Sequence, residues 1–200
     1  MGESALLLNE FQREWLDEDA VLHRMVPAEE MRSVITSATR AVEAARAAGV
    51  LVVHSGVKLS PGYDELGSAR HGLRADLPRD QRFAGERAHL VAPFAPVGDE
   101  YVSWRPGTVS DFNGSSLDQY LRNQGVTRLY IAGFALHVCV LATAIHANDL
   151  GYDVSLLGDA CGCFTTDQRS FVEDVMHHYG EHVTVQDFVD EIAAQPALIR

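Results

Sequence analysis

The sequence lacks the features that mark several large classes of protein. Its 200 residues contain no apolar run of about 18 residues, the length that a membrane-spanning helix needs. Lys and Arg number 16 against 28 Asp and Glu, so the formal net charge is −12. Because phosphate groups are bound by Lys and Arg clusters, neither nucleic acid nor an anionic membrane is the expected partner. Gly133 stands alone, without a phosphate-binding glycine loop, which disfavours a dinucleotide enzyme.

Cysteine is also scarce. The three cysteines, Cys139, Cys161 and Cys163, are an odd number in a chain too long for a small disulfide scaffold. The start lacks the basic flank and apolar stretch of a signal peptide, and Leu6 stands where a myristoylation motif needs Ser or Thr. We therefore expect a cytoplasmic protein with free thiols. Length and ordinary composition predict one domain over residues 1–200.

Short apolar runs alternate with helical patterns along the chain. Between Pro27 and Gly49, apolar residues recur every three or four positions, and the proline and glycine mark the ends of a helix. Ser116 and Thr165 are each followed three residues later by Gln, the spacing of a capping box. The expected strands are 5–8, 50–53, 100–104, 128–132, 154–157 and 183–185, and the expected helices are 27–49, 116–125, 138–150, 165–179 and 187 onward. This alternation predicts an α/β fold, a three-layer α/β/α sandwich with a mainly parallel, roughly six-stranded sheet.

The long segment 55–100 shows no sustained hydrophobic period, so it is predicted to be mostly loop with a short helix. A connection of this length in a compact domain is usually functional, as a lid or as a surface for substrate or another subunit. We expect substrate specificity to lie there.

Ligands of an open parallel sheet bind beyond the carboxyl ends of its strands. That rule gathers polar and aromatic residues from distant parts of the chain at one edge of the predicted sheet. In chain order they are Asn9 and Glu10, His54, Trp104 and Arg105, the segment from Gly133 to Cys139, and the segment from Asp159 to Cys163.

Cys139 has the most suggestive identity in this set. It falls in the first turn of a predicted helix, where unpaired backbone N–H groups and the helix dipole favour an anion. Such a position lowers a thiol pKa and favours the nucleophilic thiolate, and the same N–H groups can hold an oxyanion. The alternative is a structural role, since free cysteine is among the most buried residue types.

Several segments resemble the isochorismatase-like cysteine hydrolases, a superfamily that also contains nicotinamidases, ureidoacrylate hydrolases and other amidohydrolases. The similar segments are Gly133 to Val140 with Thr143-Ala144, Gly151 to Val154, Asp159 to Cys161, the opening strand Leu6 to Gln12, and Ser110-Asp111-Phe112. In the superfamily the opening strand typically ends in an Asp-x-Gln-like pattern, and the last of these segments reads Ser-Ala-Phe. The resemblance implies a six-stranded parallel sheet, an Asp–Lys–Cys triad and a backbone oxyanion hole around a cis peptide just before the cysteine. It also implies a small-molecule substrate and a homo-oligomer, either a dimer or a tetramer.

The triad transfers only in part. Cys139 falls on the nucleophile position, with Ala135 and Cys139 supplying the oxyanion backbone. Asn9 falls where the base Asp stands, and an amide cannot accept a proton as a carboxylate does. At the Lys position strict spacing gives Pro106, and a one-residue slip places Arg105 there.

A nucleophilic Cys139 would then need activation by the helix terminus or by a different base. The candidate acid/base groups are Glu10, His54 and His137. The alternatives are a solvent-facing glutamate and histidines that are hydrogen-bonded in the wall of the fold. His137 has extra support, because isochorismate-cleaving members resemble this segment in having His two residues before the cysteine-equivalent position.

No cofactor or metal is expected. Nicotinamidase-like members carry an Asp and His metal site, but no compact Asp-x-His spacing surrounds His54 or His71. A second possible metal cluster joins a weak Cys-x-Cys pair to histidines on separate elements, for which solvated or core roles are favoured; its members are Cys161, Cys163, His177, His178 and His182.

Three functional hypotheses follow. The first is hydrolysis of a C–N bond in a small amide or ureide through Cys139 and a covalent acyl-enzyme. The second is acid-catalysed chemistry such as vinyl-ether hydrolysis, or a related non-hydrolytic reaction, and the third is a catalytically lapsed scaffold that binds a ligand. Phe134, Trp104 and Phe11 are candidates to line an apolar pocket, although core aromatics give the same pattern.

Overall fold

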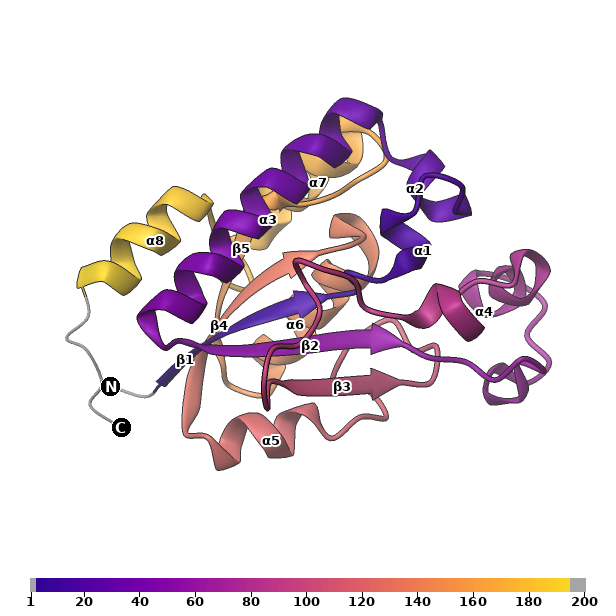
Figure 1. The fold of residues 1–200 in the computed structure, drawn as a ribbon, viewed down its shortest axis with the longest axis horizontal. Helices are drawn as coiled ribbons and strands as arrows, with labels where there is room; N and C mark the ends of the chain where they lie inside the picture. The colour runs from indigo at the N-terminus through magenta and orange to yellow at the C-terminus, as the bar shows by residue number, and fades with distance from the viewer. Residues whose placement is uncertain (1–2, 195–200) are drawn as a thin grey trace.

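A six-stranded parallel sheet forms the centre of the computed structural model (Figure 1). The structure describes residues 3–194, apart from the side chains of residues 79 and 80. Two parts of the sequence lie outside the described residues: Met1 and Gly2, considered above for a leader or acyl anchor, and the end of the expected domain 1–200. The strands are β1 Glu3–Asn9, β2 Leu51–Val57, β3 Tyr101–Arg105, β4 Val126–Gly133, β5 Asp153–Cys161 and β6 Glu181–Val183, in the order β3-β2-β1-β4-β5-β6. The predicted sheet is confirmed, and its order reverses between β1 and β4.

Helices cover both faces of the sheet (Figure 1). The helices are α1 Arg13–Leu16, α2 Val21–Met25, α3 Ala28–Ala48, α4 Leu73–Asp76, α5 Leu117–Asn123, α6 Leu141–Asp149, α7 Thr166–Met176 and α8 Val185–Ala194. Helices α3 and α8 pack on one face, and α5, α6 and α7 pack on the other. The predicted three-layer sandwich is therefore confirmed. Within the described residues, none of the helices is long and apolar enough to cross a membrane.

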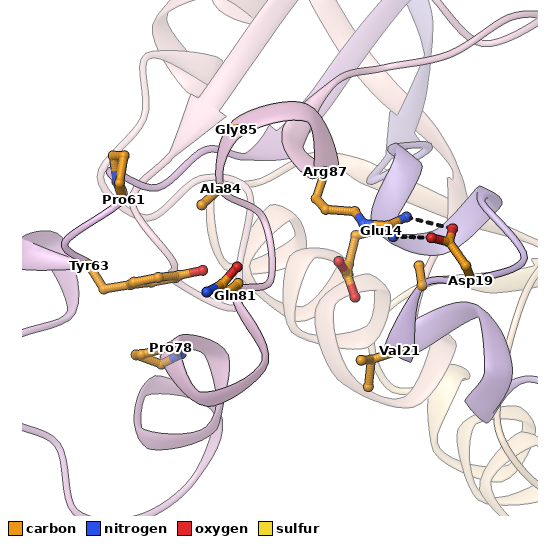
Figure 2. Close-up of a pocket in the computed structure, with 11 residues that line it drawn as sticks. Glu14, Asp19, Val21, Pro61, Tyr63, Pro78, Gln81, Ala84, Gly85 and Arg87 are labelled. Atoms are coloured by element: carbon orange, nitrogen blue, oxygen red, sulfur yellow. Dashed lines mark hydrogen bonds and ion pairs between the residues drawn. The ribbon is translucent and has the colours of Figure 1, made fainter.

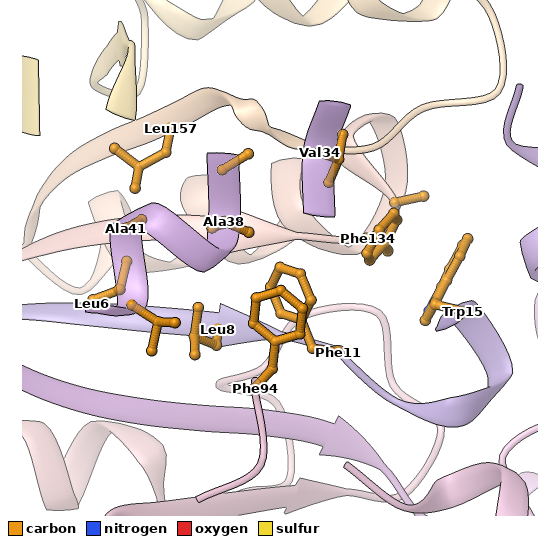
Figure 3. Packing of buried hydrophobic residues seen from close by; sticks show 14 of the residues in the cluster. Leu6, Leu8, Phe11, Trp15, Val34, Ala38, Ala41, Phe94, Phe134 and Leu157 are labelled. Carbon is orange, nitrogen blue, oxygen red and sulfur yellow. The ribbon is translucent and has the colours of Figure 1, made fainter. Parts of the chain in front are cut away.

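The first of these layers follows from the sequence pattern of α3. The helix lies between Pro27 and Gly49 as predicted, and Gly49 adopts φ 71°, the left-handed conformation that suits glycine at a helix end. Its apolar stripe is buried against β1 and β5, where Val34, Ala38 and Ala41 meet Leu6, Leu8 and Leu157 (Figure 3). Burial of an apolar stripe, more than intrinsic propensity, is what stabilises such a helix.

Strand β2 runs further than its sequence indicated. The expected end at His54 is wrong, because β2 continues through Ser55 and Gly56 to Val57. The side chain of His54 is fully buried, and its Nε2 lies 2.8 Å from Oε2 of Glu100. Arg46 donates to the same carboxylate at 2.8 and 2.9 Å. A polar residue therefore continues the strand because its hydrogen bond with the Glu100 carboxylate compensates for its burial.

Capping residues gave one correct and one wrong prediction. Thr165 caps α7 in a complete capping box, accepting from the Gln168 backbone at 3.2 Å while Gln168 accepts from the Thr165 backbone at 3.1 Å. The box expected at Ser116 is wrong, since that hydroxyl lies 2.5 Å from the hydroxyl of Tyr101 on β3 and caps nothing. The Ser116 hydroxyl therefore contacts a side chain of β3 instead of the backbone of its own helix.

Helices α1 and α2 were not predicted, and the other differences are shifts of element boundaries. The helix expected from Val138 begins earlier, with a π-helical turn, η4 Leu136–Val140, that continues into α6. The last strand lies two residues before its expected position, and Val185 opens α8 instead. The segment 55–100 contains the end of β2, the short helix α4 and three 3-10 turns, η1 Asp64–Leu66, η2 Leu77–Asp80 and η3 Gly85–Ala88, which agrees with the prediction of mostly loop.

Candidate active site

Glu10, Arg105 and Cys139 line one cavity of about 90 Å³. Glu10 follows β1, Arg105 ends β3, and Cys139 lies in η4 directly after β4. The cavity therefore lies at the carboxyl edge of the sheet, beside the point where the strand order reverses. This is where an open parallel sheet binds its ligand.

The backbone turns sharply at the end of β1 to bring Glu10 into the cavity. Glu10 has φ 59°, in the left-handed region that few residues other than glycine adopt. Its backbone N–H donates to the carbonyl of Ser55 on the neighbouring strand at 2.8 Å, and Trp15 Nε1 donates to its Oε2 at 2.8 Å. Non-glycine residues in this region cluster at functional sites, where the surrounding contacts hold them.

Arg105 is the centre of a buried charge cluster. One guanidinium nitrogen donates to Glu10 Oε1 and the other donates to Asp111 Oδ1, and all three side chains are almost completely buried. Nε of Arg105 donates to the Thr108 carbonyl at 2.6 Å. Burial raises the pKa of the Asp111 carboxyl, while the positive charge of Arg105 and the nearby Ser55 hydroxyl oppose that rise. A planar fork that holds two carboxylates is a role that suits arginine and not lysine.

Cys139 is only 8% exposed, and its environment acts on the thiol in opposite directions. Burial raises the pKa of Cys139, the charge of Arg105 lowers it, Asp111 raises it, and a hydrogen bond from the Ala135 backbone lowers it. The net direction is upward, contrary to the expectation that the helix terminus would lower the pKa of this thiol. Desolvation outweighs the helix terminus, and the resting thiol needs a base.

The backbone before Cys139 has the feature that the resemblance implied. The peptide bond between Phe134 and Ala135 is cis, and Ala135 lines the cavity beside Cys139. Gly133 comes immediately before this pair, with φ 141°, and a Cβ there would lie 1.9 Å from the carbonyl oxygen of Asn9. Only glycine allows β4 to approach β1 so closely at the point where both strands end.

The assignment of Asn9 to the base position requires correction. Asn9 is the last residue of β1 and is not among the residues that line the cavity, whereas Glu10 is. The spacing of Glu10-Phe11-Gln12 matches the Asp-x-Gln-like pattern of the resemblance and could have identified Glu10. Gln12 has a structural role, bonding through its side chain to both backbone groups of Val57 and to the Ala88 carbonyl.

Of the two residues considered for the lysine position, Arg105 lines the cavity and Pro106 does not. Sequence reasoning missed Asp111 entirely. Its signal was a charged residue in Ser110-Asp111-Phe112, where the similar segment reads Ser-Ala-Phe. The carboxylate of Asp111 accepts a hydrogen bond from Arg105, the residue at the expected lysine position.

The aromatic candidates do not line the cavity. Trp104 precedes Arg105 on β3 and therefore points to the opposite face, where it is 38% exposed and Lys58 Nζ lies 5.7 Å from its ring centroid. Phe134 is a core residue packed at 5.0 Å on Trp15 and at 5.5 Å on Phe11, measured between ring centroids (Figure 3). Trp15, which was not predicted, is the member of this cluster that lines the cavity.

Neither histidine candidate lines the cavity. His54 is paired with Glu100 inside the sheet, as described above. His137 packs edge-on against Phe164 at 4.9 Å between ring centroids, and burial lowers its pKa. A metal group is also not seen: within residues 3–194, no three His, Cys, Asp or Glu side chains gather as metal ligands would.

The other two cysteines lie apart from the cavity. Cys161 is fully buried, and burial raises its pKa to about 12. Burial raises the pKa of Cys163 to about 11, and its Sγ lies 3.5 Å from Oε1 of Glu30. Both are neutral thiols at ordinary pH.

A larger, more open cavity of about 650 Å³ is lined by residues from the segments 14–21 and 61–87 (Figure 2). Adjacent residues of α2 separate the two spaces, with Val21 lining the open cavity and Leu22 the small one. The open cavity contains neither the thiol nor the charge cluster, and its Asp19 is paired with Arg87 at 2.7 Å. Glu10, Arg105 and Cys139 therefore lie together at the smaller cavity.

Comparisons with known proteins identify the family and support the fold. The model of the isochorismatase domain matches residues 4–187. Ureidoacrylate amidohydrolase RutB of Variovorax paradoxus is 31% identical over 83% of this chain and 71% of its own length, and maleamate amidohydrolase of Pseudomonas putida is 25% identical over 94% and 86%. An isochorismatase family protein from Desulfovibrio vulgaris superposes with a TM-score of 0.83 at 23% identity, covering 96% of this chain and all of the other. The chain belongs to the isochorismatase family.

Proposed function

We propose that the protein hydrolyses a C–N bond of a small amide or ureide, with Cys139 as nucleophile and Glu10 as base. The observation that carries the proposal is the presence of Glu10, Arg105 and Cys139 around one cavity. The similarity to a ureidoacrylate and a maleamate amidohydrolase supports the same class of bond.

The reaction begins with a neutral thiol, because burial raises the pKa of Cys139. Glu10 accepts the thiol proton as sulfur attacks the carbonyl carbon, and Arg105 offsets the negative charge that develops nearby. Glu10 already accepts hydrogen bonds from Trp15 and Arg105, which hold its carboxylate in place. The Ala135 backbone beside the thiol is suited to stabilise the oxyanion.

The C–N bond then breaks, and the amine leaves with the proton held by Glu10. Water attacks the resulting thioester, Glu10 takes a proton from that water, and the proton returns to sulfur as the acid product leaves. Catalysis in this scheme needs no cofactor.

The test compares Cys139→Ser and Glu10→Gln with the natural protein on a panel of small amides and ureides, measuring released ammonia. Both variants should lose at least about 100-fold in kcat/KM, the range of general acid–base catalysis. Rapid quench and mass spectrometry should find an acyl adduct on Cys139 in the natural protein. Cys163→Ala is the matched control, since its thiol lies outside the cavity, and it should keep full activity.

Other outcomes would identify the alternatives. Turnover of a vinyl ether that persists in Cys139→Ala but disappears in Glu10→Gln would replace covalent catalysis with proton delivery by the carboxyl group. Absence of both turnover and adduct across the panel would leave a ligand-binding scaffold.

A further inference from the structure

Apolar side chains form almost the whole wall of the small cavity. Around Glu10, Arg105 and Cys139 the wall includes Trp15, Leu22, Val57, Leu77, Phe83 and Phe164. Three of these come from the segment 55–100, in which specificity was expected to lie. A ligand pocket usually adds several placed polar groups to such a wall in order to orient a polar substrate.

Both cations in this wall, Arg82 and Arg105, already have partners within the protein, so far as the described residues show. Arg105 is held by Glu10, Asp111 and the Thr108 carbonyl. Arg82 also has a partner within the protein, while its buried Nε makes no hydrogen bond. The cluster of Glu10, Asp111 and Arg105 has no net positive charge while at least one of its two carboxyl groups is ionised. A substrate carboxylate would therefore be desolvated beside Glu10 with only already paired cations to offset its charge, which is costly in an apolar site.

The size of the cavity limits the part of the substrate that it encloses. An apolar protein cavity of about 150 Å³ holds benzene, so about 90 Å³ encloses roughly three or four non-hydrogen atoms. A longer substrate must extend to the rim.

The rim is apolar as well. Met25 on α2, Leu73 on α4 and Val109 after β3 all line the cavity, yet they are 44%, 39% and 37% exposed. They are three of the six large hydrophobic side chains that are most exposed among the described residues. Exposed apolar side chains gathered around a cavity mark a binding surface for an apolar group.

We propose that the substrate is an uncharged carboxamide with an apolar acyl group of about four to six carbon atoms, whose distal end lies against Met25, Leu73 and Val109. This inference rests on the proposed C–N hydrolysis by Cys139. It separates this protein from relatives named for ureidoacrylate and maleamate, both of which carry a carboxylate. Hydrolysis converts the neutral amide into ammonia and a carboxylate, and the carboxylate product is repelled by Glu10, which favours its release.

The test uses a matched pair of amides. In 4-methylpentanamide an isopropyl group replaces the carboxylate of succinamate, at nearly equal size. The neutral amide should have a kcat/KM at least about 100-fold higher, as the cost of burying an uncompensated charge requires. Equal or faster turnover of succinamate or maleamate would overturn the inference while leaving the proposed hydrolysis intact.

Binding to Cys139→Ala separates the two proposals if no amide is turned over. In a thermal-shift titration of this variant, 4-methylpentanamide should stabilise the protein and succinamate should not. Stabilisation by succinamate alone, or by neither ligand, would refute the substrate class. Failure of turnover together with stabilisation by the neutral amide would refute the hydrolysis only.

A rim variant tests the position of the distal end. Leu73→Asn should reduce kcat/KM for 4-methylpentanamide by about 10-fold, the effect of losing one or two methylene contacts, and should reduce it less for acetamide. Phe171→Asn is the matched control, because Phe171 is 55% exposed on α7 and lies outside the cavity. Equal losses for both amides, or the same loss in the control, would contradict the assignment of the rim.

Discussion

Replacing Arg105 by methionine should destabilise the protein in a way that depends strongly on pH. Methionine keeps the apolar stem but removes the guanidinium that lies between Glu10 and Asp111. At least one buried carboxylate is then left without a partner. The folded variant can avoid a buried, unpaired charge if this carboxylate takes up a proton. In the unfolded chain the same carboxyl group is exposed and carries no proton at pH 7.

The cost of that proton sets the expected magnitude. A carboxyl with an ordinary pKa of about 4 requires about 1.4 kcal/mol for each pH unit above that value, or about 4 kcal/mol at pH 7. This agrees with the 3–5 kcal/mol (roughly) that breaking a buried ion pair usually costs. For a chain of this length the loss corresponds to about 8–16 °C in Tm.

The sign of the pH dependence follows from linkage. The folded variant binds a proton that the unfolded chain has lost, so its carboxyl pKa is raised and its stability falls as pH rises. The loss of about 4 kcal/mol at pH 7 should shrink to about 1.4 kcal/mol at pH 5.

Urea unfolding at pH 5, 6 and 7, followed by circular dichroism, measures this difference directly. Arg13→Met is the matched control, because Arg13 is 40% exposed and pairs with Glu86 on the surface. The control should lose less than about 1 kcal/mol at every pH. A stability of Arg105→Met equal to that of the control, or a loss that does not change with pH, would refute the buried charge cluster as described.

Three further results are expected. Gly133→Ala should lower the free energy of unfolding in urea by about 2–4 kcal/mol, because its Cβ would overlap the β1 backbone. The control Gly151→Ala, at φ 87° but with open space around it, should lower it by about 1 kcal/mol. Equal losses would contradict the close approach of the strands. Burial alone would raise the pKa of Glu100, but its hydrogen bonds from Arg46 and His54 hold the pKa at about 2. The natural protein should therefore be more stable than Glu100→Gln above pH 4.5, and this difference in stability should vanish as pH falls toward 2. A difference that is constant with pH would exclude this account. Asp111→Asn removes one of the charges that raise the pKa of Cys139, so iodoacetamide labelling of that thiol should begin at lower pH than in the natural protein; an unchanged profile would show that the carboxyl does not affect the thiol.

The sequence alone determined the elements that repeat a strong local pattern. Two features were predicted correctly: the helix between Pro27 and Gly49 and the capping box at Thr165. Both depend only on residues close together in the sequence, through periodic burial in the helix and a local hydrogen bond in the capping box. The same holds for the position of Cys139 at the start of a helix and for Arg105 at the end of a strand.

Tertiary structure alone decided which side chains meet. The left-handed backbone of Glu10 brings it into the cavity that Cys139 also lines and leaves Asn9 outside, and a one-residue difference of this kind has no periodic signal. The alternation of side chains along β3 directs Trp104 outward and Arg105 inward, but the buried face is set by helices elsewhere in the chain. The partnership of Arg105 with Asp111 depends on a loop that folds back after the strand. The contact of Arg105 with Glu10 is long-range and electrostatic, and it forms only when β1 and β3 are both in place in the sheet.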